Sequence, residues 1–134
     1  MITIKTISTF RTHLQDLLNV RKGVYSGVQD EIKREFQDAD IGTIRNNRDM
    51  ILMQDDAVIV KYRLGDRRMK LSKANGYRLI YMVSTIYERV VFLDIYPKRG
   101  PLQQLDITSS HLLQLIVEFN NEDEQGALVL YDAL

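Results

Sequence analysis

The sequence predicts one α+β domain, in which helices pack on one face of an antiparallel meander sheet, with the element order β-α-α-β-β-β-α. Its 134 residues fit a single domain of ordinary size. The first 40 residues combine one alternating apolar stretch with two stretches of helical periodicity. Residues 50–97 contain short apolar stretches separated by turn residues, which is typical of a β-meander.

The N-terminal segment is expected to form a strand and then two helices. Residues 2–7 alternate between apolar and polar side chains and are rich in β-branched residues, which predicts a half-buried strand. Ser8 or Thr9 is the expected N-cap of the first helix, and Gly23 is its expected end. The apolar residues at helical spacing are Phe10, Leu14, Leu17 and Leu18 in the first helix, and Val28, Ile32, Phe36 and Ala39 in the second. His13 falls on the polar face of the first helix.

The central part of the chain predicts the strands of the meander. Short strands are expected at residues 50–53, 57–64, 68–71, 77–83 and 89–96. Consecutive strands joined by short loops are most simply antiparallel neighbours. Pro97 has no N–H to donate to a ladder, so the last of these strands is expected to end there.

The C-terminal part is expected to hold one helix and an acidic end. Thr108 or Ser109 is the expected N-cap of a helix whose apolar residues continue to Phe119. Residues 120–126 are polar and acidic, which predicts a linker, and the apolar residues 127–131 are expected to dock as a strand. The predicted division is a domain over residues 1–119 and an acidic C-terminal extension over residues 120–134.

The composition excludes several kinds of site. The chain has no cysteine, which excludes a disulfide, a cysteine-ligated metal and a thiol nucleophile. Its two histidines, His13 and His111, make a histidine-built zinc site unexpected, and no glycine-rich phosphate loop occurs. No stretch approaches the roughly 20 apolar residues of a membrane span, and residues 1–5 do not resemble a signal peptide. We therefore expect a cytoplasmic protein with no membrane, metal or cofactor partner.

The formal net charge of zero conceals an uneven distribution. Residues 61–99 hold 10 Lys and Arg against 3 Asp and Glu, a net charge of +7. Residues 100–134 hold 6 Asp and Glu and no Lys or Arg, a net charge of −6. A basic segment followed by an acidic one indicates a surface that binds a polyanion. The alternative is that the cations only cover exposed strand faces.

Cations on the predicted strands could converge on one positive surface. Lys61 and Arg63 share a face of their strand because side chains two residues apart point the same way, and Arg68 and Lys70 repeat this spacing. The remaining candidates are Arg78, Lys98 and Arg99, with Tyr62, Tyr77, Tyr81 and Tyr96 as stacking surfaces. Cations that hold phosphates beside rings that stack on bases are typical of single-stranded RNA binding. In the alternative interpretation, Arg78 is structural and pairs with Asp94 across the hairpin.

The residues of this hairpin carry a more specific signal. Residues 76–83 are Gly-Tyr-Arg-Leu-Ile-Tyr-Met-Val, and residues 89–99 are Arg-Val-Val-Phe-Leu-Asp-Ile-Tyr-Pro-Lys-Arg. The sequence of this hairpin resembles the RelE/ParE superfamily of bacterial toxins, in which a Gly-Tyr-Arg strand pairs with a Val-Val strand that ends in Lys-Arg. Outside residues 76–99 the resemblance is one of element order alone.

The resemblance implies a function and a set of site residues. RelE-like members are toxins of type II toxin–antitoxin systems. They cleave mRNA on the ribosome by attack of a ribose 2′-OH on the adjacent phosphodiester, and a cognate antitoxin holds them inactive. By the family pattern, the catalytic residues are Arg78 in the central strand, Arg99 after the next strand, and the preceding basic pair Arg68 and Lys70, with the lysine as a base if its pKa is depressed by its cationic neighbours. The residues expected to bind RNA are Lys61, Arg63, Lys98 and Tyr96.

Two departures from the family pattern keep an alternative function open. RelE-like members usually carry a C-terminal Tyr or His that completes the site, but residues 100–105 here contain neither. Tyr96 or His111 could substitute, although neither is at the matching position. RelE-like toxins are also usually basic, whereas this chain is neutral. The alternative is a non-enzymatic protein, either a ParE-like gyrase-binding toxin or an inactive regulatory relative.

The acidic end allows two interpretations of its own. Its acids Glu122, Asp123, Glu124 and Asp132 could lie against the basic surface and mask cations meant for phosphate. Alternatively, the end is solvated and only lowers the isoelectric point.

Overall fold

The computed structural model describes residues 3–40, 43–44, 50–54, 57–84 and 86–133. Its elements are β1 (Thr3–Thr6), α1 (Ser8–Leu18), the 3-10 turn η1 (Arg21–Gly23), α2 (Val28–Phe36), β2 (Met50–Gln54), β3 (Ala57–Leu64), β4 (Tyr77–Ser84), β5 (Arg89–Pro97), α4 (Ser109–Glu124) and β6 (Val129–Leu130). The predicted α+β class is confirmed, and so is the predicted Thr108 cap of α4, whose hydroxyl accepts from the His111 N–H. Within the described ranges, no helix has the length and apolar character needed to cross a membrane.

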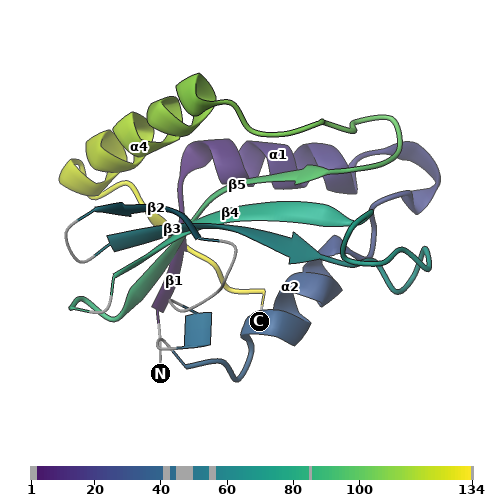
Figure 1. Cartoon of the computed structure of the whole chain (residues 1–134), viewed down its shortest axis with the longest axis horizontal. Coiled ribbons are helices and arrows are strands. Elements are labelled where there is room, and N and C mark those ends of the chain that lie inside the picture. The colour runs from purple at the N-terminus through teal and green to yellow at the C-terminus, as the bar shows by residue number, and fades with distance from the viewer. Residues whose placement is uncertain (1–2, 41–42, 45–49, 55–56, 85, 134) are drawn as a thin grey trace.

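The strands form one mixed sheet in the order β2-β3-β4-β5-β1-β6 (Figure 1). The meander from β2 to β5 is antiparallel, as predicted, but β1 pairs parallel with β5, and the short β6 pairs antiparallel with β1. The predicted all-antiparallel sheet is therefore wrong. A parallel pair needs a long crossover connection, and the chain from α1 to β4 provides it.

The helices cover both faces of the sheet, so the prediction of helices on one face is wrong. Figure 1 shows α2 below the strands and α4 above them. On the face that we call the α2 face, Phe10 of α1 and Phe36 of α2 join the main core. On the opposite face, the α4 face, Leu115 and Phe119 pack with strand residues that include Ile80. Since both faces of the central strands are apolar, both need a covering layer.

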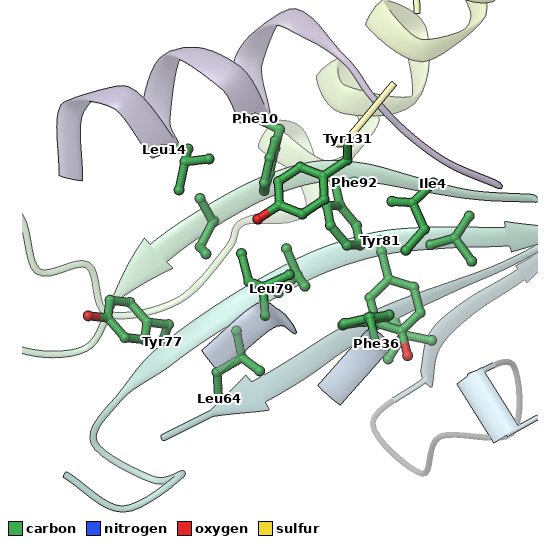
Figure 2. Close-up of a cluster of buried hydrophobic side chains, with 14 of the residues drawn as sticks. Ile4, Phe10, Leu14, Phe36, Leu64, Tyr77, Leu79, Tyr81, Phe92 and Tyr131 are labelled. Carbon is green, nitrogen blue, oxygen red and sulfur yellow. The ribbon is translucent and has the colours of Figure 1, made fainter. Parts of the chain in front are cut away.

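The C-terminal residues are part of this fold. Residues 120–124, which the sequence assigns to a linker, continue α4, so the predicted boundary at residue 119 falls within a helix. Tyr131 is buried against Phe10 and Phe92, with ring centroids 5.9 and 5.1 Å away (Figure 2). Asp123 holds the Arg89 guanidinium with two hydrogen bonds of 3.1–3.2 Å. Of the acids proposed as a mask, Asp123 is therefore already paired outside the predicted RNA-binding residues.

The N-terminus of α1 is capped from a distance. The N-cap residue is Ile7, which has no side-chain hydrogen-bonding group, so the predicted cap at Ser8 or Thr9 is wrong. Instead, the backbone N–H groups of Ser8 and Thr9 donate to the carboxylates of Glu122 and Glu118 of α4, at 3.1 and 3.2 Å. Carboxylates at the positive end of a helix stabilise it, so these two contacts join α4 to α1.

The segment that precedes β4 is a turn, not the strand predicted at residues 68–71. Asp66 and Leu71 form an isolated bridge, with backbone hydrogen bonds of 3.0 and 2.8 Å. The Asp66 carboxylate accepts from the Met69 N–H, and Lys70 has a φ of 57°, in the left-handed region. These contacts close a tight loop, so the alternating residues 68–71 do not form a ladder.

Candidate nucleic-acid interface

The strands bring four of the predicted residues together on the α4 face. Arg63 of β3 lies opposite Arg78 of β4, which lies opposite Tyr96 of β5. Tyr96 belongs to the cluster beneath α4, and residues directly opposite in a sheet share a face. Lys61 lies two residues before Arg63, on the same face, as the alternation predicts. We call Lys61, Arg63, Arg78 and Tyr96 the cation row.

Arg78 is the buried cation of the cation row. Its side chain is only 8% exposed, and its guanidinium donates to the backbone carbonyls of Lys73, Ala74 and Tyr77 at 3.0–3.2 Å. In the hairpin register it lies opposite Tyr96, whereas Asp94 lies opposite Ile80. Arg78 therefore fixes the connection between β3 and β4.

An acidic residue occupies the other end of the cation row. The Asp106 carboxylate accepts from the Lys61 ammonium at 3.0 Å and, on the same oxygen, from the Tyr96 hydroxyl at 3.3 Å. Lys98 donates to the neighbouring Leu105 carbonyl. The hydrogen bond from Lys61 lowers the pKa of Asp106, while burial and then the charge of Asp106 raise the pKa of Tyr96 to about 12. This geometry, an ammonium and a phenol on one oxyanion, suits a phosphate oxygen as well as a carboxylate.

The other predicted cations lie on connections at the same end of the sheet. Arg68 and Lys70 are exposed in the turn before β4, and Arg99 is exposed just after β5. The Arg99 guanidinium has one long contact, 3.5 Å to the Asn75 amide oxygen. Neither Arg63, Arg68 nor Lys70 has an ion pair or a side-chain hydrogen bond with any residue that the structure describes. Three cations without such a partner thus lie at this end of the sheet.

A cavity of about 230 Å³ opens among these connections. Tyr25 from the α1–α2 connection and Tyr77 of β4 belong to the core on the α2 face and line this cavity, as does Arg99. Arg78 of the cation row directly follows Tyr77 in β4, and successive residues of a strand point to opposite faces. The cation row and the cavity are therefore on opposite faces of the sheet. The predicted residues fall into two groups, the row and the loop cations. Tyr62, Tyr77, Tyr81 and Tyr96, which were proposed as stacking surfaces, pack in or against the two core clusters instead.

A cluster that the sequence interpretation missed joins both helical layers. The buried Asp94 carboxylate is bound by His13 Nδ1 of α1 at 2.5 Å and by His111 Nε2 of α4 at 2.7 Å. The hydrogen bond to Asp94 raises the pKa of His13. Among the described residues, no group of three or more His, Cys, Asp or Glu side chains is arranged to hold a metal ion.

Two signals in the sequence could have identified this cluster. An aspartate within a fully apolar strand needs a polar partner, because a buried carboxylate without one is costly. His13 also stands three residues after Phe10 and four before Leu17, a spacing that places it beside the buried stripe of α1.

Comparisons with protein-family models, with curated proteins and with solved structures found no match to this chain. The RelE/ParE assignment therefore stays a prediction that depends on the residues of the β4–β5 hairpin.

Proposed function

We propose that this chain is the toxin of a toxin–antitoxin pair and that it cleaves mRNA on the ribosome, as the resemblance of residues 76–99 implies. The observation that carries the proposal is the cation row, which has Arg63, Arg78 and Tyr96 at adjacent register positions on one face. Neighbouring arginines create a positive potential that attracts the RNA backbone. The proposed partners are the ribosome with its mRNA and a cognate antitoxin.

Arg63 is the residue that we assign to the scissile phosphate. It is exposed and has no charged partner among the described residues, so its planar fork is available to bind two phosphate oxygens. A fixed positive charge there stabilises the extra negative charge of the phosphorane. Arg78 contributes positive charge from its buried position beside Arg63. Its guanidinium also holds the turn by donating to the backbone carbonyls of Lys73 and Ala74.

His111 is the proton acceptor in this proposal, in place of the C-terminal Tyr or His of the family. Tyr96 does not suit the task, since its pKa is raised to about 12. With Nε2 of His111 donating to Asp94, Nδ1 takes the proton of the 2′-OH. The 2′ oxygen then bonds to phosphorus, and the 5′ oxygen leaves and takes a proton from water. The products are a 2′,3′-cyclic phosphate end and a 5′-OH end.

The burial of Arg78 is equally compatible with the non-enzymatic alternative. The arginine that matches the central strand arginine of the family is 8% exposed and bonded to three backbone carbonyls. An arginine in that position stabilises the fold whether or not the protein is an enzyme. A gyrase-binding toxin or an inactive regulator would retain it for the same reason.

Controlled expression of the chain in a bacterial host tests the proposal. We expect translation to stop and mRNA to be cut within translated reading frames, and Arg63→Ala to abolish both effects while its melting temperature stays at the parental value. The matched control is Lys33→Ala, which removes an exposed cation from α2 and should remain fully toxic. Intact mRNA with induction of a DNA-damage response would support the gyrase-directed alternative instead.

A further inference from the structure

The cavity beside Arg99 has walls that suit a flat, mostly apolar group. Its apolar lining residues are Val24, Tyr25, Met69, Leu71, Tyr77 and Pro97. Its volume of about 230 Å³ is below the range of roughly 300–1,000 Å³ that is usual for drug-sized ligands. A single heterocyclic ring system is therefore the size of group that it can enclose.

Hydrogen bonds within the chain hold these walls in place. The Tyr25 hydroxyl donates to the Arg99 carbonyl at 2.7 Å and accepts from the Leu102 N–H at 3.0 Å, which fixes the segment after β5. The Tyr77 hydroxyl donates to the Asp66 carboxylate at 2.6 Å. Gly100 has a φ of +88°, and a Cβ there would lie 2.5 Å from the Tyr25 oxygen, so the close approach requires glycine. The cavity is preformed, which lowers the entropic cost of binding.

The charges in and around the cavity favour a ligand that has two chemically different parts. Asp66, which is 1% exposed, lines the interior and disfavours an anion there. The exposed cations stand outside: Arg99 on the rim, and Arg68 and Lys70 in the same turn as the lining residues Met69 and Leu71. The ligand that fits has a neutral ring for the interior and a negative group for the cations.

We infer that this cavity binds the base of one nucleotide of single-stranded RNA, while the loop cations Arg68, Lys70 and Arg99 hold its phosphate. The inference rests on the proposed function for its ligand and adds a base-binding subsite on the face opposite the cation row. The Asp66 carboxylate, which accepts from the Met69 N–H and the Tyr77 hydroxyl, can only accept hydrogen bonds, and the Asn75 amide, which also lines the cavity, both donates and accepts. The subsite therefore prefers a base with an exocyclic amino group, such as adenine, guanine or cytosine, over uracil.

Titration of the full chain with nucleoside monophosphates tests this inference. In calorimetry, AMP should bind at least tenfold more tightly than inorganic phosphate, and UMP should bind more weakly than AMP. In amide NMR spectra, AMP should shift the resonances of Leu71, Asn75 and Gly100. Met69 is 47% exposed, so Met69→Trp should fold normally and abolish AMP binding by filling the cavity. Met69→Leu, which keeps the volume nearly constant, should bind AMP like the parent.

Removal of the rim cation gives a second test. Arg99→Ala should weaken AMP binding about tenfold, and Lys33→Ala, which removes an exposed cation of α2, should leave it unchanged. The inference is overturned if AMP binds no more tightly than phosphate, or if folded Met69→Trp retains parental affinity. AMP binding in the cavity without any mRNA cleavage would refute the proposed enzyme and leave the subsite standing. Cleavage by the parent without any AMP binding would do the reverse.

Discussion

The Asp106 carboxylate lies 3.0 Å from the Lys61 ammonium and accepts a hydrogen bond from it. A cation that the sequence predicts to bind RNA is therefore paired with a carboxylate of the same chain. The same oxygen accepts from Tyr96. The two hydrogen bonds join the segment before α4 to β3 and β5. An incoming phosphate therefore competes with Asp106 for the Lys61 ammonium.

Replacement of this carboxylate should strengthen RNA binding. We expect Asp106→Asn to raise the affinity for a single-stranded RNA roughly threefold to fivefold at low salt, because an exposed ion pair is worth up to about 1 kcal/mol. The gain should shrink as added salt screens the charges. Fluorescence anisotropy with a labelled oligonucleotide measures it, and Asp132→Asn, an exposed acid after β6, is the control. Equal affinities for Asp106→Asn and the parent at low salt would show that Asp106 does not compete with RNA.

The His13–Asp94 contact should make stability depend on pH. The pKa of His13 is raised above 6.5, so the stabilisation is fully present below that value and is lost as the pH rises through the folded-state pKa. The other groups that face His13 are Asp16, Glu118 and, across the shared carboxylate, His111. Urea unfolding at about pH 6 and about pH 9 should show a lower free energy of unfolding at the higher pH. His13→Gln should reduce this difference in the free energy of unfolding between the two pH values. If the variant shows the same difference as the parent, the pH dependence comes from other groups.

The remote cap of α1 should contribute measurably to stability. Glu122→Ala removes the acceptor of the Ser8 N–H and a 3.7 Å ion pair with Arg11. The loss of a helix cap costs roughly 1 kcal/mol, which we expect as a lower urea midpoint with an unchanged slope. Glu124→Ala, at the exposed end of α4, is the matched control and should unfold like the parent. If the two variants unfold alike, the cap does not stabilise the fold.

The C-terminal residues should act on stability and not as a mask. Tyr131 is 9% exposed in the aromatic cluster with Phe10 and Phe92, so Tyr131→Ala should lower the free energy of unfolding by roughly 3 kcal/mol. Deletion of residues 120–134 also removes the Glu122 cap of α1 and β6, and the truncated chain should fail to give a cooperative melting curve. A truncated chain that melts like the parent would restore the interpretation of a solvated tail.

Local patterns predicted the parts of this fold that depend on neighbouring residues. Alternation placed Lys61 and Arg63 on one face, Pro97 marked the end of β5, and Thr108 marked the start of α4. Four alternating residues at 68–71 were too few to distinguish a strand from a turn closed by Asp66.

Long-range contacts account for most of the errors. The parallel pairing of β1 with β5 joins residues more than 80 positions apart, and no periodicity within β1 specifies its partner. The caps of α1 come from Glu118 and Glu122, and the partner of His13 is Asp94. The face on which α4 packs was also mispredicted, because the central strands are apolar on both faces and both faces need a covering helix. The function of the cation row stays a prediction, because it depends on a hairpin resemblance.

The central claim is that the cation row cleaves mRNA on the ribosome, and cleavage by the purified chain tests it most directly. Programmed ribosomes are incubated with the chain, and the 3′ ends of the mRNA are mapped by primer extension and analysed for a cyclic phosphate. The parent should cut ribosome-bound mRNA and leave 2′,3′-cyclic phosphate ends, and Arg63→Ala should cut it roughly a hundredfold more slowly. Lys33→Ala should cut at the parental rate. Intact mRNA with the folded parent, or parental cleavage by Arg63→Ala, would contradict the claim.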